Sequence, residues 1–462
     1  MGEKPELLAP AGGWEQLEYA IRFGADAVYL ATDKFGLRQR ACNFALDELP
    51  AVVGYAHEHG VAVHVTCNAQ MHEGDFAELP RYLQAIDAAG VDAVLVSDLG
   101  ALRYAREFAP NVDIHVSTQA SVSNVASALT WHELGATRVV CAREMSLEDI
   151  AAMRAALPET MEVEVFVHGA MCMAISGRCL ISDYLTGRSA TNGNCTQPCR
   201  WHYTLEEEKR PGVHFPVEED ERGSYIMNAK DMNMLSHLDA LVAAGVDSIK
   251  IEGRNKKAFY VATVVNAYRQ VLDGADPALF EHELDTVSHR PYGTGFYFGP
   301  AHQTPESDAY IRPYDWAVEV TGCEPLDGEG LSSERVYSGQ DAGAAGGEGE
   351  PPTRLVHSGR DASTVRGDQS LRTGEPAGGY LITGICRNRF WEGSELEVLS
   401  PGQPVRNLRV KGLKHLPEEG RPCDVDIANR AMERYSFASP FELHPHDIAR
   451  IERAERTTKP VE

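Results

Sequence analysis

One short phrase recurs in the first half of the chain and restricts the folds that it can adopt. A glycine is followed by Ala or Val, then by Asp or Thr, and then by an apolar, mostly β-branched run, at Gly24, Gly90, Gly135 and Gly245. Glycine commonly ends helices because it adopts the left-handed conformation, and short apolar runs are typical of strands buried on both faces. Each copy therefore predicts a helix that ends at the glycine and a buried strand that follows within two residues.

Further apolar runs fit strands between these copies, at 6–9, 62–66, 113–117 and 162–167. About eight strand starts within ~250 residues is the count of a TIM-like (β/α)8 barrel, and a doubly wound open sheet is the alternative. We therefore expect an α/β fold and favour the barrel.

Polar residues follow many of the predicted strands. In a parallel barrel the chemistry lies at the C-terminal face, where strands end and loops begin. The sequence therefore predicts a functional site at this face. The strand-end residues are Asn68, Ser117, Thr118, Gln119, Arg143, Glu144, His168, Lys250, Glu252 and Arg254.

Four of the ten cysteines lie in one segment, 168–203, that hangs from the same face. They are Cys172, Cys179, Cys195 and Cys199. The glycines, asparagines and proline between them rule out a long regular element, and thiolates that converge in such loops suit a metal ion or an iron–sulfur cluster. An iron–sulfur cluster is favoured because structural zinc usually uses two tight Cys-x2-4-Cys pairs, whereas the first pair here is more widely spaced. Zinc and four unligated thiols are the alternatives.

Charge and hydropathy restrict the partners and the compartment. We find no signal peptide and no apolar run of membrane-spanning length, so we expect a cytoplasmic protein with free thiols and no membrane contact. The net charge of -25 argues against a surface that is basic throughout. Any contact with nucleic acid must therefore depend on local Arg and Lys patches.

The chain divides into two expected domains. The barrel should occupy 1–290, with a connector at 291–315, a second domain at 316–445 and a tail at 446–462. Short strands separated by turns predict a small C-terminal β-barrel in the second domain.

Two segments are expected to lie outside the packed core. An insertion at 324–378, rich in Gly, Ser and acidic residues, cannot bury enough apolar surface to order itself, and we expect disorder there. The acidic stretch 205–222 should be a solvated excursion.

One basic run lies in the second domain. It is either a solvated strand edge or a phosphate-contacting face. It contains Arg406, Arg409, Lys411 and Lys414.

The cysteine segment resembles the signature of the collagenase-like peptidase family U32. The resemblance lies in His168 to Cys172, Ser176 to Cys179 with Ser182, Gly193 to Cys195, and Cys199 to Trp201. It extends over about residues 5 to 320 and the β-rich tail is similar to the family's C-terminal domain. Other matching stretches are PELLAPAG near the start, Ser121 to Asn124, Arg143-Glu144, Asn228 to Asp231 and Lys250 to Arg254.

The resemblance implies an activity that spacing alone does not show. Better-understood members of the family carry a 4Fe-4S cluster and hydroxylate RNA bases or quinone precursors without oxygen, with prephenate implicated as the hydroxyl source. By length and tail, the chain is most similar to members that help to install 5-hydroxyuridine at the tRNA wobble position. This implies a tRNA uridine hydroxylase with tRNA, a small dicarboxylate donor and an electron-transfer or sulfur-assembly protein as partners. The alternatives are a U32-type peptidase, although the sequence has no His-Glu-x-x-His or Gly-x-Ser-x-Gly motif, and a non-enzymatic RNA-binding assembly factor.

The resemblance also assigns the cluster ligands. Cys172, Cys179 and Cys195 are the expected ligands, with Cys199 as the fourth and Cys42 as the alternative fourth ligand.

The remaining site residues follow from the chemistry that such a reaction needs. A dicarboxylate donor needs cations, and arginine suits bidentate binding of carboxylates. His168 is a candidate proton carrier, oriented by Glu252 or Asp231. The alternatives are a packed strand-end histidine and, for Glu252 and Arg254, a structural ion pair at the barrel rim. The candidate cations are Arg178, Arg200, Lys250 and Arg254.

Overall fold

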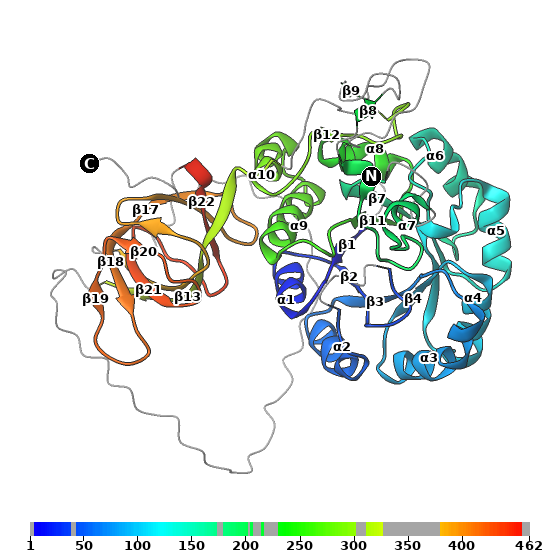
Figure 1. Cartoon of the computed structure of the whole chain (residues 1–462), viewed down its shortest axis with the longest axis horizontal. Coiled ribbons are helices and arrows are strands. Elements are labelled where there is room, and N and C mark those ends of the chain that lie inside the picture. Colours follow the sequence, from blue (N-terminus) through cyan, green and yellow to red (C-terminus); the bar gives the residue numbers. More distant parts are fainter. Residues whose placement is uncertain are drawn as a thin grey trace, which may run out of the picture.

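The computed structural model contains a closed barrel and a separate antiparallel sheet (Figure 1). It describes residues 4–37, 43–172, 179–201, 204–206, 214–216, 230–301, 311–326 and 379–454, without the side chains of residue 200 and of the two three-residue segments.

Eight parallel strands form the barrel. Each pairs in parallel with its neighbours, and β11 pairs with both β1 and β7, so the ring closes. This confirms the predicted TIM-like (β/α)8 barrel and excludes the open doubly wound sheet. The strands are β1 (Glu6–Pro10), β2 (Ala27–Leu30), β3 (Ala62–Cys67), β4 (Ala93–Val96), β5 (Asp113–Val116), β6 (Arg138–Val140), β7 (Glu162–Ala170) and β11 (Ser248–Ile251).

Helices surround this ring of strands (Figure 1). The recurring glycines behave as the sequence predicts, because all four have positive φ, from 74° to 103°, and the next strand begins three residues later. The helices are α1 (Trp14–Arg22), α2 (Leu49–Glu58), α3 (Leu79–Ala88), α4 (Leu99–Phe108), α5 (Val125–Glu133), α6 (Leu147–Ala156), α8 (Leu238–Ala243), α9 (Ala258–Leu272) and α10 (Glu281–Thr286).

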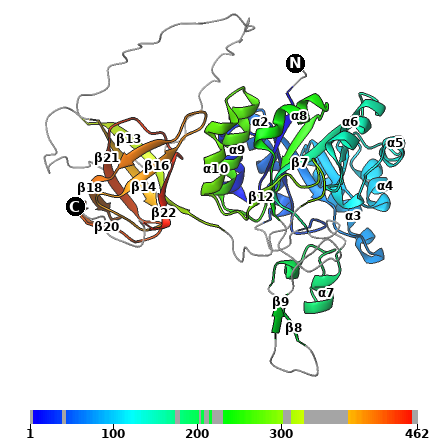
Figure 2. The same cartoon turned by 90° about the horizontal axis from the view of Figure 1, so that it is seen from above.

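Short elements extend the barrel beside β7. β10 (Asp231–Asn233) pairs antiparallel with β7, and β12 (Tyr292–Gly293) pairs with β10, so the predicted connector begins inside the barrel sheet. Within the predicted acidic excursion, β8 (Thr204–Glu206) pairs with β9 (His214–Pro216). Figure 2 shows these two strands and α7 (Ile181–Thr186) standing out from one side of the barrel.

The second sheet is curled and antiparallel, in the order β17-β16-β22-β13-β14-β21-β18-β19. Its core contains apolar side chains such as Val318, Ile382 and Phe437. A separate pair of short strands, β15 (Phe390–Trp391) and β20 (Ile427–Ala428), packs with it. The strands are β13 (Tyr314–Pro325), β14 (Tyr380–Cys386), β16 (Glu395–Leu399), β17 (Arg406–Arg409), β18 (Lys411–Leu416), β19 (Cys423–Asp424), β21 (Arg434–Ser439) and β22 (Ile448–Glu452).

The predicted limits of this domain differ from the sheet at two places. β22 lies beyond residue 445 and pairs with β13 and β16 in the middle of the sheet, because its buried Ile448, Ala449 and Ile451 complete the core. β13 extends to Pro325, into the first residues of the predicted insertion. The rest of that insertion, 327–378, lies outside the described residues, so its expected disorder stays a prediction.

A buried arginine joins the two domains. The side chain of Arg450 is 0% exposed and donates from Nη1 to Glu283 of α10 at 2.8 Å and from Nη2 to Glu397 of β16 at 2.6 Å. Trp316 packs edge-on against Tyr19 of α1 at 5.4 Å. Figure 1 shows the antiparallel sheet lying beside α9 and α10.

The basic run of the second domain is largely paired. Arg409 lies 3.7 Å from Glu395, Lys414 lies 3.6 Å from Asp424, and the guanidinium of Arg406 lies over Phe441. These contacts fit the strand-edge interpretation better than a phosphate-contacting face. Across the described ranges, no helix combines the length and the apolar character that a membrane span requires.

Candidate active site

A cavity of about 170 Å³ opens at the C-terminal ends of the barrel strands. Strand-end side chains and all four cysteines of the predicted cluster segment line it together. The site therefore lies on the face that the sequence predicts. Its strand-end lining includes Thr66, Asn68, Ser117, Gln119, Arg143, Phe166, Lys250, Glu252 and Arg254.

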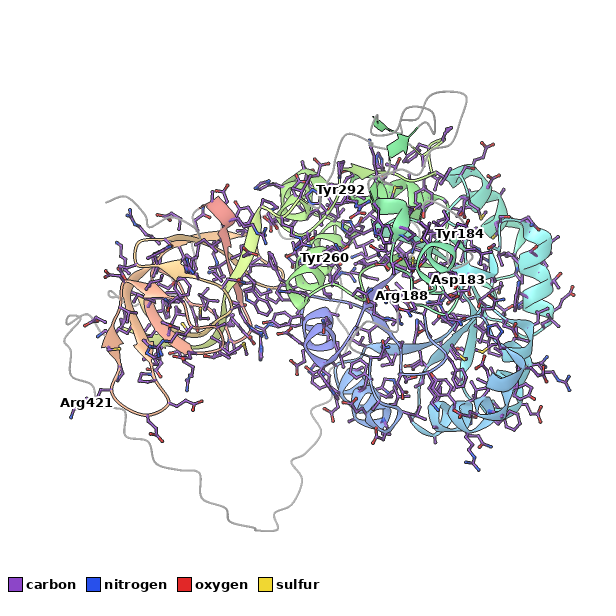
Figure 3. The ribbon with its side chains drawn as sticks, viewed as in Figure 1. Asp183, Tyr184, Arg188, Tyr260, Tyr292 and Arg421 are labelled. Carbon is purple, nitrogen blue, oxygen red and sulfur yellow. The ribbon has the colours of Figure 1, made fainter. Side chains whose placement is uncertain are left out.

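The cysteine segment folds back on α7. Ser182 of α7 accepts a hydrogen bond from the N–H of Thr196 at 3.0 Å and donates to the carbonyl of Arg188 at 2.7 Å. The side chain of Arg188 in turn donates to Asn194 at 2.5 Å. The chain can reverse here because Gly187 and Gly193 have positive φ. These contacts bring the second pair of cysteines back toward the first pair, around α7 and Arg188; Figure 3 labels Arg188 and, on α7, Asp183 and Tyr184.

The four thiols are not placed within the distances of a closed tetrahedral zinc site. A tetrahedral zinc with Zn–S bonds of ~2.3 Å holds its sulfurs about 3.8 Å apart. In the described part of the chain, the set of His, Cys, Asp and Glu ligand atoms that converges within 4.8 Å is that of His64, His115 and Glu164, not one of cysteines. Among the described residues, no three of these thiols lie within 4.8 Å of one another, although all four line the same cavity.

Other contacts narrow the choice of ligands. The backbone N–H of Gln197 donates to the Cys195 sulfur at 3.2 Å, a hydrogen bond of the kind that tunes cluster potentials. Cys67 and Cys141 lie in the barrel core, where burial raises the pKa of both thiols. They therefore remain protonated and do not compete as ligands. Cys42, the alternative fourth ligand, lies outside the described residues.

Two glycines allow the segment 252–254 to lie against the ends of β1 and β7. A Cβ at Gly12 would lie 2.1 Å from the carbonyl oxygen of Arg254, and a Cβ at Gly169, with φ of +102°, would lie 2.4 Å from that of Glu252. Arg254 is 4% exposed, and its Nη1 donates to the hydroxyl of Thr66 at 3.0 Å. This close packing places Arg254 among the residues that line the cavity.

Lys250 lies at the cavity floor within a buried chain of charges. Its ammonium donates to Glu164 at 2.8 Å and lies 4.5 Å from the ring centre of Tyr29. Arg138 contacts the other oxygen of Glu164 at 3.3 Å and Glu6 at 2.6 Å. Burial lowers the pKa of Lys250, and Glu164 opposes that shift. Lys250 can thus donate hydrogen bonds to a substrate, but Glu164 already balances its charge.

The converging set of His64, His115 and Glu164 is better explained as a structural layer of the barrel than as a metal site. The two imidazoles pack edge-on at 4.8 Å. Burial lowers the pKa of His64 to about 4 and the pKa of His115 well below its usual value, so both rings are neutral near pH 7. A metal ion on Glu164 would lie beside Lys250 and Arg138, which already bind both carboxylate oxygens.

His168 and Asp231 are not among the described residues that line the cavity, contrary to our expectation for a proton carrier. The cause is a register shift between β7 and β11. Phe166 pairs with Lys250, but His168 pairs with Ile251, so an extra residue on β7 turns His168 away from the cavity. Its ring packs between Tyr260, Tyr268 and Tyr292, which belong to α9 and β12.

The surroundings of His168 do not suit proton transfer near neutral pH. The side chain is 1% exposed, and burial lowers its pKa to about 3. Asp231 lies on β10, behind the same tyrosines, and accepts a hydrogen bond from the backbone N–H of Arg290 at 3.2 Å. The packed strand-end histidine, the alternative interpretation of the sequence, therefore describes His168.

Of the expected cations, Lys250 and Arg254 line the cavity, as does the expected acid Glu252. Arg178 and the side chain of Arg200 lie outside the described part of the chain. Arg143, which the sequence places at this face without a specific role, also lines the cavity. Its guanidinium stacks on Phe166, 3.7 Å from the ring centre.

The cysteine segment that lines the cavity also carries exposed apolar side chains. Tyr184 is 90% exposed, Leu180 is 66% exposed and Trp201 is 45% exposed. Tyr184 lies on α7 and is labelled in Figure 3. Aromatic side chains that are largely exposed beside a cavity are suited to contact a partner.

Comparison with known proteins gives relatives with three kinds of names. Each alignment covers 64% of this chain. The tRNA hydroxylation protein P1 of Bacillus subtilis is 40% identical over 306 residues, which cover 72% of that protein. The 23S rRNA 5-hydroxycytidine C2501 synthase of Escherichia coli is 36% identical over 296 residues, or 43% of its length. A collagenase of Porphyromonas gingivalis is 32% identical over 312 residues, or 73% of its length.

The family model for peptidase family U32 matches residues 12–307, which include the barrel strands β2 to β7 and β11, the cysteine segment and the cavity. Because this match covers more than half of the chain, the chain belongs to peptidase family U32.

Proposed function

We propose that this chain is an RNA-hydroxylating enzyme that acts on tRNA, with the wobble uridine as its target. The relatives named for tRNA hydroxylation and for rRNA hydroxycytidine synthesis support RNA hydroxylation as the reaction class. The observation that carries the proposal is the single cavity in which four cysteines meet Lys250, Glu252 and Arg254. A thiol-rich site with charged side chains at a barrel mouth suits redox chemistry on a small polar substrate.

The thiols would hold a 4Fe-4S cluster through Cys172, Cys179, Cys195 and Cys199. With a cysteine on each iron, such a group supplies an electron relay when it is bound. Replacing C–H by C–OH with a hydroxide-level donor removes two electrons from the base, so a separate electron-transfer protein would accept them, and a sulfur-assembly protein would build the cluster. The hydrogen bond from Gln197 to the Cys195 sulfur would stabilise the ligand in its thiolate form.

The charged residues would bind and orient the hydroxyl donor. A small dicarboxylate, for which we propose prephenate, can accept hydrogen bonds from Lys250 and Arg254 at the cavity wall. Glu252 would accept a proton or a hydrogen bond from the donor's hydroxyl. Since His168 is buried behind the cavity and neutral, proton movement falls to Glu252 rather than to His168.

The exposed aromatic rim would contact the RNA. A base can reach a cavity inside a barrel only when it leaves its stack, and proteins commonly stack such unpaired bases on aromatic side chains. Tyr184 and Trp201 offer such faces at the rim. They provide contacts that do not depend on charge, in a protein whose net charge of -25 repels RNA.

The test is the tRNA of a strain that lacks this protein. We expect nucleoside mass spectrometry to show loss of wobble hydroxyuridine, restored by the wild-type gene but not by Cys172→Ala or Cys179→Ala. The same variants, purified anaerobically, should lose iron and the brown iron–sulfur absorbance. Unchanged hydroxylation in the deletion strain would refute the proposal, and RNA binding without a modification defect would instead indicate an assembly factor.

A peptidase is the second candidate, since a collagenase is among the relatives. A cysteine hydrolase needs a histidine beside its nucleophile. The cysteine segment contains two histidines: His168 is not among the described residues that line the cavity, and His202 lies outside the described residues. Gelatin cleavage by colourless, zinc-loaded protein, abolished by Cys172→Ala, would favour the peptidase.

A further inference from the structure

Arg143 is a buried cation in the cavity wall without a carboxylate partner among the described residues. It follows β6, lines the cavity and is 8% exposed. Its Nη1 donates to the carbonyl of Ala170 at 2.8 Å and contacts the sulfur of Met171 at 3.9 Å. Its Nε is buried and has no hydrogen-bond partner in the described part of the structure.

Two other buried cations of the barrel have carboxylate partners. Arg138 contacts Glu6, Glu162 and Glu164, and Lys250 contacts Glu164. Within the described ranges, the contacts of Arg143 are instead a carbonyl, a thioether and the face of Phe166. Arginine stays protonated in proteins, and a buried charge without a counter-charge is costly. An anion that binds in the cavity beside the Arg143 guanidinium would supply the missing counter-charge.

The geometry favours a carboxylate as that anion. Nε and Nη2 form one edge of a guanidinium, and this edge binds a carboxylate through two parallel N–H···O bonds. In Arg143 the carbonyl of Ala170 uses Nη1, and no described residue accepts a hydrogen bond from Nε. Phe166 fixes the guanidinium plane by stacking at 3.7 Å, and the same ring lies 5.6 Å from the ammonium of Lys250. One small ligand above Phe166 could therefore contact both cations.

An RNA phosphate fits this position less well. Phosphates belong to the RNA backbone, which would follow the rim beside Tyr184, whereas Arg143 is buried among strand ends.

We infer that Arg143 binds a carboxylate group of a small acidic substrate inside the cavity and so determines which donor the enzyme accepts. The inference rests on the proposed function in placing the hydroxyl donor in this cavity. It adds a positioning residue from β6 to the cations on the β11 side, so that a dicarboxylate would be held from two sides. Arg143 takes no part in bond making and orients the ligand only.

The test measures donor binding and turnover separately on the cluster-loaded protein. Calorimetry with prephenate should show that Arg143→Gln weakens binding about tenfold to a hundredfold, the effect of losing a charge-assisted bidentate contact. Arg143→Lys should recover part of the lost affinity for prephenate, since lysine keeps the positive charge but lacks the two parallel N–H donors of the guanidinium. In tRNA hydroxylation assays, the KM for prephenate should rise by a similar factor while the KM for tRNA stays unchanged.

Arg106→Gln is the matched control, because Arg106 also donates from Nη1 to a backbone carbonyl, that of Leu134, but on the outer helix α4. It should leave both KM values unchanged. The inference is overturned if the wild-type protein binds no small carboxylate, if Arg143→Gln binds prephenate as the wild type does, or if only the KM for tRNA rises, which indicates a phosphate contact.

These outcomes are separable from those of the proposed function. If no RNA is hydroxylated but the binding difference persists, the proposed function fails and the carboxylate site remains. If RNA is hydroxylated but Arg143→Gln does not change donor binding, the proposed function stands and the inferred carboxylate site at Arg143 fails.

Discussion

Replacing Gly169 by alanine tests the close packing on which the cavity depends. The new Cβ would lie 2.4 Å from the carbonyl oxygen of Glu252, whereas ordinary contact begins at 3.4 Å. The Glu252 backbone must therefore retreat by about 1 Å, a displacement that can cost about a hundredfold in activity when it misplaces reacting groups. The positive φ of Gly169 adds backbone strain of ~1–2 kcal/mol for an L-residue.

Overpacking typically costs a further ~1–3 kcal/mol, so the two effects together predict a loss of about 2–5 kcal/mol in unfolding free energy. Gly60 provides the matched control, because its φ is also positive, at +74°, but a Cβ there meets nothing within 4 Å. Gly60→Ala should lose only the strain, about 1 kcal/mol, and should retain full activity.

Urea denaturation measures the stabilities, and mass spectrometry of tRNA nucleosides measures the activity. Equal urea midpoints for Gly169→Ala and Gly60→Ala, with normal hydroxylation by both, would refute the close approach of β7 to Glu252. Gly12→Ala provides a second check, since its Cβ would lie 2.1 Å from the carbonyl oxygen of Arg254. It should reduce activity in the same way.

Three further predictions concern other parts of the molecule. Arg450→Met should destabilise the protein by ~3–5 kcal/mol in urea, because it leaves Glu283 and Glu397 without their buried partner, whereas Arg453→Met, which breaks the more exposed pair with Asp315, should cost less than ~1 kcal/mol. His168 has a folded pKa of about 3 against 6.5 for the free side chain, so the unfolded chain binds the extra proton and stability falls as the pH drops from about 6.5 toward 3. His168→Phe should therefore reduce the loss of stability between pH 7 and pH 4 by about 1.4 kcal/mol per unit below pH 6.5, and urea titrations that show equal pH dependence would contradict this. Tyr184→Ala should weaken tRNA binding in fluorescence anisotropy about tenfold without changing stability, since the side chain is 90% exposed, and an exposed control on the outer surface, Leu279→Ala, should bind as the wild type does.

The sequence predicts the barrel well because its signals are local. Each recurring glycine ends a helix, and the apolar run after it can only be a strand buried on both faces. Repetition of this unit then determines the closed ring, and the ring determines the face on which strand-end polar residues gather. The joint lining by Cys172, Lys250 and Arg254 follows from these steps alone.

What the sequence does not predict depends on register and on pairing between distant residues. A strand pattern places Phe166 and His168 on the same face, and the one-residue shift against β11 separates them. Arg143 has no carboxylate partner among the described residues, and only the structure reveals this, because it depends on residues that are distant in the sequence. β22 was missed because it is a five-residue strand that follows a turn near the end of the chain, and only its central place in the sheet reveals its importance.

The strand that completes the ring also carries the charges of the site. β11 joins β1 to β7, pairing Ser248 with Glu6 across most of the barrel sequence, and leads directly into Glu252 and Arg254. In a chain in which β11 has not paired with β1 and β7, the four thiols lack Lys250 and Arg254 beside them. The cavity is therefore complete only when β11 has paired with β1 and β7. Slow amide hydrogen exchange along β11 should identify the molecules in which the site is complete.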